Sequence, residues 1–199
     1  MRVIVGLGNP GHRYAATRHN VGFAVLEELA RRWRLPFGPT RHGGRLAPGL
    51  IDNEQVLLVE PQRYMNMSGP ALSELQPLVS AAELIVVHDD LDIECGRIRV
   101  KRGGGTGGHR GIESIAEHYG PDFVRVRVGI GRPPAGEDPA AYVLSPFADA
   151  EREPITAAVA RAADAVECIQ RHGVEGAMNR FNTRSKSASP VTAVPVRRN

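Results

Sequence analysis

The chain opens with RVIVGLGNPG, residues 2–11. Its first half is rich in β-branched residues and runs into Gly-Asn-Pro-Gly, which is typical of a buried strand that ends in a turn. Helical periodicity begins near Asn20, after which apolar residues recur at every fourth position: Val21, Val25, Leu29 and Trp33. A strand followed by an amphipathic helix over 20–34 is the first unit expected of an α/β domain.

The rest of the chain continues to alternate between strand and helix patterns. Further strands are predicted at 45–51 and 55–59, as a hairpin around Asp52-Asn53, and at 84–88, 97–101 and 123–130. Further helices are predicted after a Ser68 cap, with Leu72, Leu75 and Val79 inward, then after 103–108, over 151–172 and over 174–182. This order predicts one three-layer α/β domain, residues 1–182, with a twisted mixed β-sheet flanked by helices. Residues 183–199 are polar and aperiodic, which predicts a disordered basic tail.

The composition indicates a globular cytoplasmic protein. The 199 residues are 42% hydrophobic and 24% charged, and no apolar run is long enough to span a membrane. Cys95 and Cys168 are the only cysteines, too few for a disulfide framework or a thiolate metal site. The first strand is not preceded by a secretory signal pattern. We therefore expect a cytoplasmic location with no membrane partner.

Two Gly-rich stretches fit the G-x-G-x-x-G spacing of a dinucleotide-binding turn. The first, Gly6 to Gly11, does not open a helix directly, and the acidic residues about 20 positions on, Glu27 and Glu28, lie inside one. A Rossmann-type nucleotide enzyme is therefore disfavoured. The second stretch, 103–108, opens a helix, where free N–H groups can hold an anion. It is either a phosphate or carboxylate contact or a tight turn that glycine permits.

Cations alternate with apolar residues in two of the predicted strands. Arg97, Arg99 and Lys101 share one face of the first, and Arg125 and Arg127 share one face of the second. If the two strands are neighbours, five cations lie side by side on a chain of net charge +3, which suits a phosphate backbone. The alternative is a solvated face whose cations pair with Asp or Glu from elsewhere.

Polar side chains follow or precede the predicted strands and helices, where α/β domains bind ligands. They are Asn9, His19, Asn66, Asp89, His109 and Arg110. The positive end of the helix after His19 favours the neutral imidazole that a general base needs, and Asp89 can accept its other ring N–H. Asn9 and Asn66 can hold a substrate peptide or a developing oxyanion. Because Gly-x-Ser-x-Gly and a metal-ligand spacing are both absent, we expect His19 to activate water without a metal.

The order and spacing of these stretches resemble bacterial-type peptidyl-tRNA hydrolases. The matching segments are VGLGNPGHRYAATRHNVGF (5–23), PQRYMNMSG (61–69), HDDLDIECG (88–96), GGGTGGHRG (103–111) and VGIGRP (128–133). The resemblance, which covers about residues 2–182, implies hydrolysis of the ester between a nascent peptide and the 3′ ribose of tRNA. That reaction recycles peptidyl-tRNA released in aborted translation and uses no metal or organic cofactor. We also expect a monomer with no obligate protein partner.

The resemblance assigns roles to individual positions. His19 is similar to the family's catalytic base and Asp89 to its orienting partner, while Lys101 and Arg127 fall where the family clamps the tRNA 5′ phosphate. Asn9 and Asn66 resemble the family's substrate-positioning asparagines, and Tyr14 and Met65 are expected to line the same cleft. The clamp agrees with the basic face inferred from the strand pattern.

One position departs from the family pattern. After Gly-Gly-His the family commonly has an asparagine that contacts the peptide and the catalytic water, whereas here Arg110 follows His109. Arginine donates hydrogen bonds but does not accept them, so it binds a phosphate or an acyl carbonyl instead, or covers the crevice. Both residues are kept as substrate-binding candidates. The departure also leaves open a relative that binds structured RNA on the same scaffold without hydrolysing it, which the intact Asn9, His19, Asn66 and Asp89 disfavour.

Overall fold

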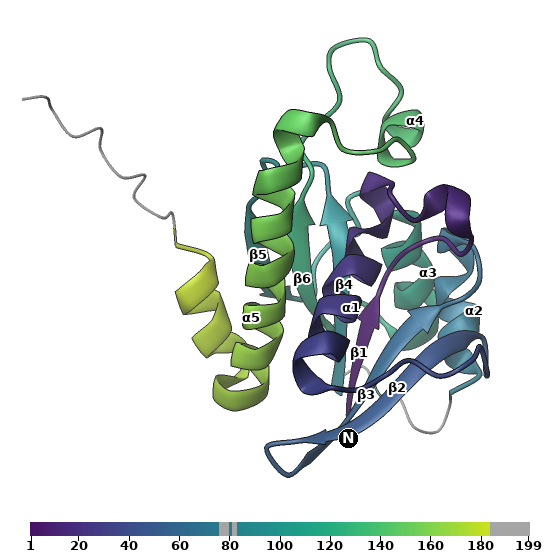
Figure 1. Cartoon of the computed structure of the whole chain (residues 1–199), viewed down its shortest axis with the longest axis vertical. Coiled ribbons are helices and arrows are strands. Elements are labelled where there is room, and N and C mark those ends of the chain that lie inside the picture. The colour runs from purple at the N-terminus through teal and green to yellow at the C-terminus, as the bar shows by residue number, and fades with distance from the viewer. Residues whose placement is uncertain (76–79, 81–82, 184–199) are drawn as a thin grey trace, which may run out of the picture.

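The computed structural model describes residues 1–75, 80 and 83–183. A six-stranded sheet runs through the middle, in the order β2-β3-β1-β4-β6-β5 (Figure 1). Its parallel strands are β1 (Arg2–Gly6), β3 (Glu54–Pro61), β4 (Leu84–Asp90) and β6 (Val124–Gly129). β2 (Gly44–Ile51) and β5 (Ile98–Arg102) are antiparallel strands at the two edges. The predicted mixed sheet is confirmed.

Helices cover both faces of the sheet, which confirms the three layers (Figure 1). α1 (Val21–Trp33) and α5 (Asp149–Phe181) pack on one face, and α2 (Ser68–Ser73) and α3 (Arg110–Tyr119) pack on the other. Each face has its own apolar core, because alternate residues of the buried strands point to opposite sides. No helix within the described residues has the length and apolarity that crossing a membrane requires.

Most predicted elements lie close to their expected positions. α1 begins after Asn20 and ends before Arg34, and the hairpin turns at Asp52 and Asn53, whose φ values of 51° and 64° suit a tight two-residue turn. α5 contains both predicted C-terminal helices, separated by a break at Gly173 with φ 73°. Residues 184–199, and with them nearly all of the predicted tail, lie outside the described residues.

The predicted cap at Ser68 is wrong. A short 3-10 turn, η3 (Met65–Met67), precedes α2, and Met67 takes the capping position. The Ser68 hydroxyl donates instead to the carbonyl oxygen of Met65 at 2.8 Å, because the chain is already turning there. The predicted inward position of Val79 lies outside the described residues.

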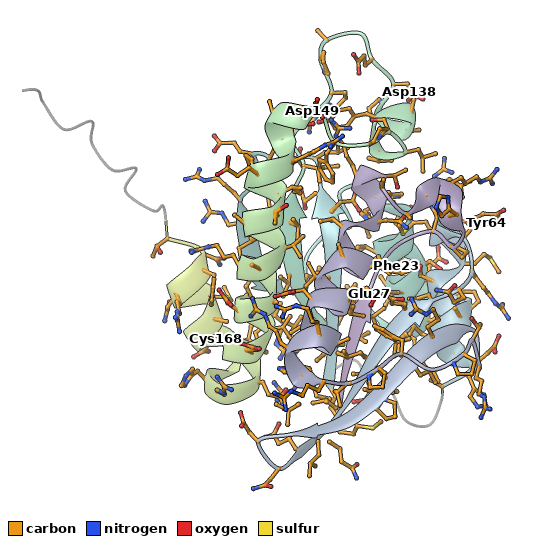
Figure 2. The ribbon with its side chains drawn as sticks, in the orientation of Figure 1. Phe23, Glu27, Tyr64, Asp138, Asp149 and Cys168 are labelled. Atoms are coloured by element: carbon orange, nitrogen blue, oxygen red, sulfur yellow. The ribbon has the colours of Figure 1, made fainter. Side chains whose placement is uncertain are left out.

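The helix α4 (Pro139–Val143) was not predicted. Asp138 caps it, accepting from the amide groups of Ala140 and Ala141 at 3.1 and 3.3 Å, and lies at the outer end of the molecule (Figure 2). The sequence signal is an Asp-Pro pair followed by only a few residues, too short for periodicity to register. The loop that carries α4 lies over the carboxyl ends of the strands (Figure 1).

α1 crosses the sheet so closely that backbone meets backbone. A Cβ atom on Gly22 would lie 2.5 Å from the amide nitrogen and carbonyl oxygen of Leu7 and from the carbonyl oxygen of Val87. A Cβ atom on Gly6 would lie 2.4 Å from the carbonyl oxygen of Gly22. Only glycine allows this approach. The contact holds the start of α1, and the 3-10 turn η2 (Arg18–Asn20) before it, over the ends of β1 and β4.

Replacing Gly22 with alanine tests this contact. Gly22→Ala is expected to lower the free energy of unfolding by about 3 kcal/mol, since the new methyl group meets backbone that cannot rotate away. Urea unfolding measures the change. Gly38→Ala is the matched control, because a Cβ atom there has only the Leu46 carbonyl oxygen nearby, at 3.6 Å. Equal stability of the two variants would contradict the close approach.

Candidate active site

A cavity of about 850 Å³ opens at the carboxyl ends of β1, β3 and β4. This is the edge where open α/β sheets bind ligands. Its lining includes all ten predicted site residues: Asn9, Tyr14, His19, Met65, Asn66, Asp89, Lys101, His109, Arg110 and Arg127. Elements far apart in sequence therefore converge on one site, while the roles of the individual residues remain predictions.

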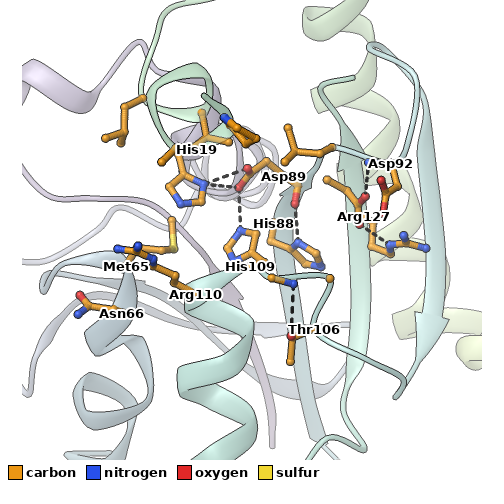
Figure 3. Close-up of a pocket in the computed structure, with 18 of the residues that line it drawn as sticks. His19, Met65, Asn66, His88, Asp89, Asp92, Thr106, His109, Arg110 and Arg127 are labelled. Carbon is orange, nitrogen blue, oxygen red and sulfur yellow. Dashed lines mark hydrogen bonds and ion pairs between the residues drawn. The ribbon is translucent and has the colours of Figure 1, made fainter. Parts of the chain in front are cut away.

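His19 and Asp89 form a buried pair at the centre of the cavity (Figure 3). The Nδ1 atom of His19 lies 2.8 and 2.9 Å from the two carboxylate oxygens of Asp89. Because a carboxylate only accepts, Nδ1 carries the proton and Nε2 is left with a free lone pair. Nε2 has no hydrogen-bond partner in the described part of the chain and is the nitrogen available to a substrate.

His109 is a second donor to the same carboxylate. Its Nδ1 atom accepts from the amide groups of Gly111 and Ile112, at 3.2 and 3.4 Å, and so caps α3. Nε2 must then carry the proton, which it donates to Asp89 at 2.9 Å. The sequence placed His109 at the site but did not predict this bond, because it depends on how α3 docks.

The Asp89 carboxylate is held in its ionised form. It is only 2% exposed, and this burial raises its pKa. The electrostatic attraction and the hydrogen bonds of His109 and His19 lower the pKa by more, so the net result is a pKa below the usual range. Asp89 can therefore stabilise a proton that arrives on His19.

A third histidine, His88, is buried behind the pair. Its Nδ1 atom donates to the carbonyl oxygen of Asp89 at 2.6 Å, and its ring meets the His109 ring edge-on, with centroids 4.9 Å apart. Burial, and after it the electrostatic effect of the neighbouring His109 ring, hold its pKa well below the ordinary value. His88 is thus a neutral wall of the cavity, which the sequence did not single out.

Asn9 is oriented so that it presents a donor to the cavity. Its side-chain oxygen accepts from the Met65 amide at 2.8 Å, which leaves the NH₂ group without a partner among the described residues. Asn20 fixes the Asn9 backbone from both sides, accepting from its amide at 2.9 Å and donating to its carbonyl at 3.0 Å. Sequence reasoning missed Asn20, although its place between His19 and α1 was a signal.

The basic face is only partly available. β5 and β6 are neighbours, with Arg99 opposite Arg127 and Lys101 opposite Arg125, so the predicted shared face is confirmed. Arg125, however, is 1% exposed and donates to the carbonyl oxygens of Gly104 and Gly105 at 2.8 and 2.7 Å. The other two cations turn away as well: Arg99 donates to the Asn182 carbonyl and Arg97 pairs with Glu94. Only Arg97 thus has the acidic partner that the alternative predicted, whereas Arg99 and Arg125 are bound by backbone carbonyls, which neither interpretation predicted.

Lys101 and Arg127 remain directed at the cavity. Arg127 donates through Nε to Asp90 at 2.7 Å, which leaves the outer nitrogens of its guanidinium for other acceptors. The pKa of Lys101 is lowered, first by burial and then by the charges of Arg127 and Arg125. An anion bound here would relieve that repulsion. The Gly-rich loop beside them has positive φ at Gly103, Gly104, Gly107 and Gly108, as expected of a tight turn that glycine permits.

Three possible metal ligands come together in the same cluster. One atom each from His19, Asp89 and His109 lies within 4.8 Å of the others. The sequence predicted no metal because the histidines lack ligand spacing, a test that cannot detect ligands from three separate segments. Both ring nitrogens are engaged with Asp89 through protons, at 2.8 and 2.9 Å, so a cation would have to displace those protons.

The sequence profile of peptidyl-tRNA hydrolase matches residues 3–189. The chain belongs to the peptidyl-tRNA hydrolase family. It is 50% identical over 189 residues to the peptidyl-tRNA hydrolase of Rubrobacter xylanophilus, covering 91% of this chain and 100% of that one. It is 47% identical over 184 residues to the enzyme of Nocardia farcinica, covering 90% and 95%.

A solved structure agrees with the membership. Peptidyl-tRNA hydrolase from Acinetobacter baumannii superposes with a TM-score of 0.86 at 37% identity, covering 92% of this chain and 94% of that chain. The resemblance noted in the sequence and the predicted fold class are therefore confirmed. A purine nucleoside phosphorylase from Toxoplasma gondii, at 10% identity and a TM-score of 0.52, shares the fold alone.

The Asp89 carboxylate gives this peptidyl-tRNA hydrolase family member a testable pH dependence. Asp89→Asn is expected to lower the free energy of unfolding by about 3 kcal/mol near neutrality, since the amide removes the buried negative charge and replaces Oδ2 with an NH₂ group that faces the Nδ1–H donor of His19. The difference from wild type should shrink as the pH falls through about 4, because the unfolded carboxyl then takes up a proton that the folded one refuses.

Urea unfolding at a series of pH values measures this difference. Asp92→Asn serves as the control, because Asp92 is exposed and forms only a surface ion pair with Arg132. A difference for Asp89→Asn that stays constant down to about pH 3 would show that the folded carboxyl is not held ionised.

Proposed function

We propose that this chain hydrolyses the ester bond between a nascent peptide and the 3′ ribose of tRNA, and so recycles peptidyl-tRNA released in aborted translation. Family membership supports the substrate. The observation that carries the chemistry is the free Nε2 atom of His19, whose opposite nitrogen donates to the buried Asp89 carboxylate. A neutral imidazole oriented in this way is suited to remove a proton from water.

The reaction begins with water held against His19. Nε2 takes one proton as the water oxygen attacks the ester carbonyl, and Asp89 stabilises the imidazolium that results. The NH₂ group of Asn9 is placed to donate to the developing oxyanion. When the tetrahedral intermediate collapses, Nε2 returns the proton to the departing ribose oxygen. The products are the tRNA 3′ hydroxyl and a peptide carboxylate, with one proton released to solvent.

Water is the nucleophile that the site favours. Within the described residues, the cavity lining contains no serine or cysteine, and its aliphatic hydroxyl belongs to Thr106. That hydroxyl donates to Glu113 at 3.1 Å, so it is directed away from His19. The chemistry therefore needs neither a covalent intermediate nor an organic cofactor.

We also propose the bounds of the catalytic domain, its location in the cell and its oligomeric state. We place the catalytic domain at residues 1–182, since the Asn182 side chain closes α5 by bonding both backbone groups of Val100 at 2.7 Å, and we leave 183–199 as a tail. Cys95 and Cys168 are free thiols, which suits the cytoplasm, where translation supplies the substrate. All residues of the site come from one chain, which suits a monomer without an obligate protein partner.

His19→Ala is expected to reduce turnover of peptidyl-tRNA by at least about 10²-fold, since the general base is lost, while tRNA affinity changes little. Single-turnover hydrolysis and filter binding measure the two quantities. His12→Ala is the matched control, because His12 is exposed outside the cavity. Near-normal turnover by His19→Ala would refute the mechanism, and tight RNA binding by an inactive wild type would favour the non-hydrolytic relative.

The tRNA phosphate clamp has its own test. Lys101→Ala combined with Arg127→Ala is expected to raise KM for peptidyl-tRNA and to flatten its salt dependence by about two phosphate contacts. Steady-state kinetics at several salt concentrations measure this, with Arg97→Ala as control, because Arg97 lies outside the cavity and pairs with Glu94. A substrate reduced to an aminoacyl-nucleotide should be barely affected. Equal losses on both substrates would contradict a remote clamp.

A further inference from the structure

The cations that line the cavity differ in whether they already have partners. Three of them are engaged: Arg125 with the carbonyls of the Gly-rich loop, Arg127 with Asp90, and Arg132 with Asp92. The side chains of Lys101 and Arg110 have no hydrogen bond or ion pair with any other described residue. The site thus contains two unneutralised cations, of which only Lys101 is accounted for by the proposed tRNA clamp.

The acidic residues of the cavity cannot neutralise Arg110. Asp89 accepts from two histidines, and Asp90 and Asp92 hold the arginines named above. Asp138 accepts from two amides at the start of α4. Every described carboxylate of the lining is therefore committed elsewhere. Arg110 is exposed, so the five N–H donors of its guanidinium face solvent and are available to a ligand.

Arg110 lies on the side of the catalytic pair opposite Arg127 (Figure 3). It begins α3, next to Gly111, where a Cβ atom would lie only 2.6 Å from the Met65 sulfur. Met65 follows β3, whereas Arg127 and Lys101 lie on β6 and β5. In the sheet order β3-β1-β4-β6-β5, the Asp89 strand β4 separates the two sides.

The substrate is linear, with tRNA on one side of the ester and peptide on the other. If the tRNA occupies the side of Lys101 and Arg127 and the ester lies at His19, the peptide must leave past Met65 and Arg110. We propose that Arg110 is a specificity residue that binds a carboxylate of the peptide, so that the enzyme favours peptidyl-tRNAs with Asp or Glu at one of the two residues nearest the ester. This inference rests on the proposed function.

The chemistry of the group selects a carboxylate. A guanidinium fork matches the two oxygens of a carboxylate, and an unneutralised charge discriminates far more between charged and neutral ligands than an amide does. Neutral peptide carbonyls can be served by the uncharged side chains of Asn9 and Asn66, which line the same side. Phosphate is the other oxyanion of the substrate, but the linear arrangement places it on the opposite side of His19.

The test compares substrates that differ only in charge. One tRNA is charged with N-acetyl-Glu or N-acetyl-Gln, and also with N-acetyl-Glu-Ala or N-acetyl-Gln-Ala, and kcat/KM is measured for each. The wild type is expected to favour the Glu form at one of the two positions by about three- to tenfold, as for a partly exposed charge pair. Arg110→Gln should bring that ratio close to one, and Arg110→Glu should invert it.

Lys101→Ala is the matched control, because it should lower kcat/KM for the Glu and Gln forms by the same factor and leave their ratio at the wild-type value. Equal turnover of both forms by the wild type would overturn the inference while leaving the proposed function intact. So would an equal loss on both forms in Arg110→Gln that disappears when the ester is carried on adenosine without phosphate, since Arg110 would then bind phosphate. Failure of the wild type to hydrolyse any of the substrates would instead reject the proposed function.

Discussion

The buried carboxylate of Asp89 accepts ring N–H groups from His19 and His109 at the same time. A charge that is 2% exposed is costly unless several donors surround it. The two imidazoles come from opposite faces of the sheet, one from the turn before α1 and the other from the start of α3. The ends of both helices must therefore meet over β4, and the rest of the molecule has to place them there.

Two different sets of contacts place the starts of α1 and α3 over β4. On one face, Gly6 and Gly22 let α1 approach the strands until backbone touches backbone, which fixes the height of His19 above the sheet. On the other face, His109 caps α3 with Nδ1, so the bond that secures the helix also determines which nitrogen donates to Asp89. The stability of the start of α3 is thus coupled to the tautomer of His109. Losing the cap would free the Nε2 proton to move to Nδ1, and Asp89 would then have only His19 as a donor.

The sequence predicted the sheet, its helices and the His19–Asp89 pair, because strand ends in an α/β domain point to one edge and carry local signals. It could not predict the second donor, because only the docking of α3 brings His109 within 2.9 Å of Asp89. Arg125 was grouped with surface cations because alternation does not reveal a loop folded over the strand. The errors concern contacts between distant segments, about which periodicity carries no information.

The net charge of the residues around Asp89 bears on the two cations of the cavity that lack a partner, Lys101 and Arg110. Because His109 accepts from the backbone at Nδ1 and the proposed mechanism requires a neutral His19, the resting cluster of His19, His109 and Asp89 carries one negative charge in a buried place. A proton arriving on His19 converts that charge into an ion pair, which favours abstraction from water. Lys101 and Arg110, on either side, are compensated neither by this cluster nor by other described side chains. In the proposed mechanism the substrate neutralises them, so binding energy and orientation come from the same charges.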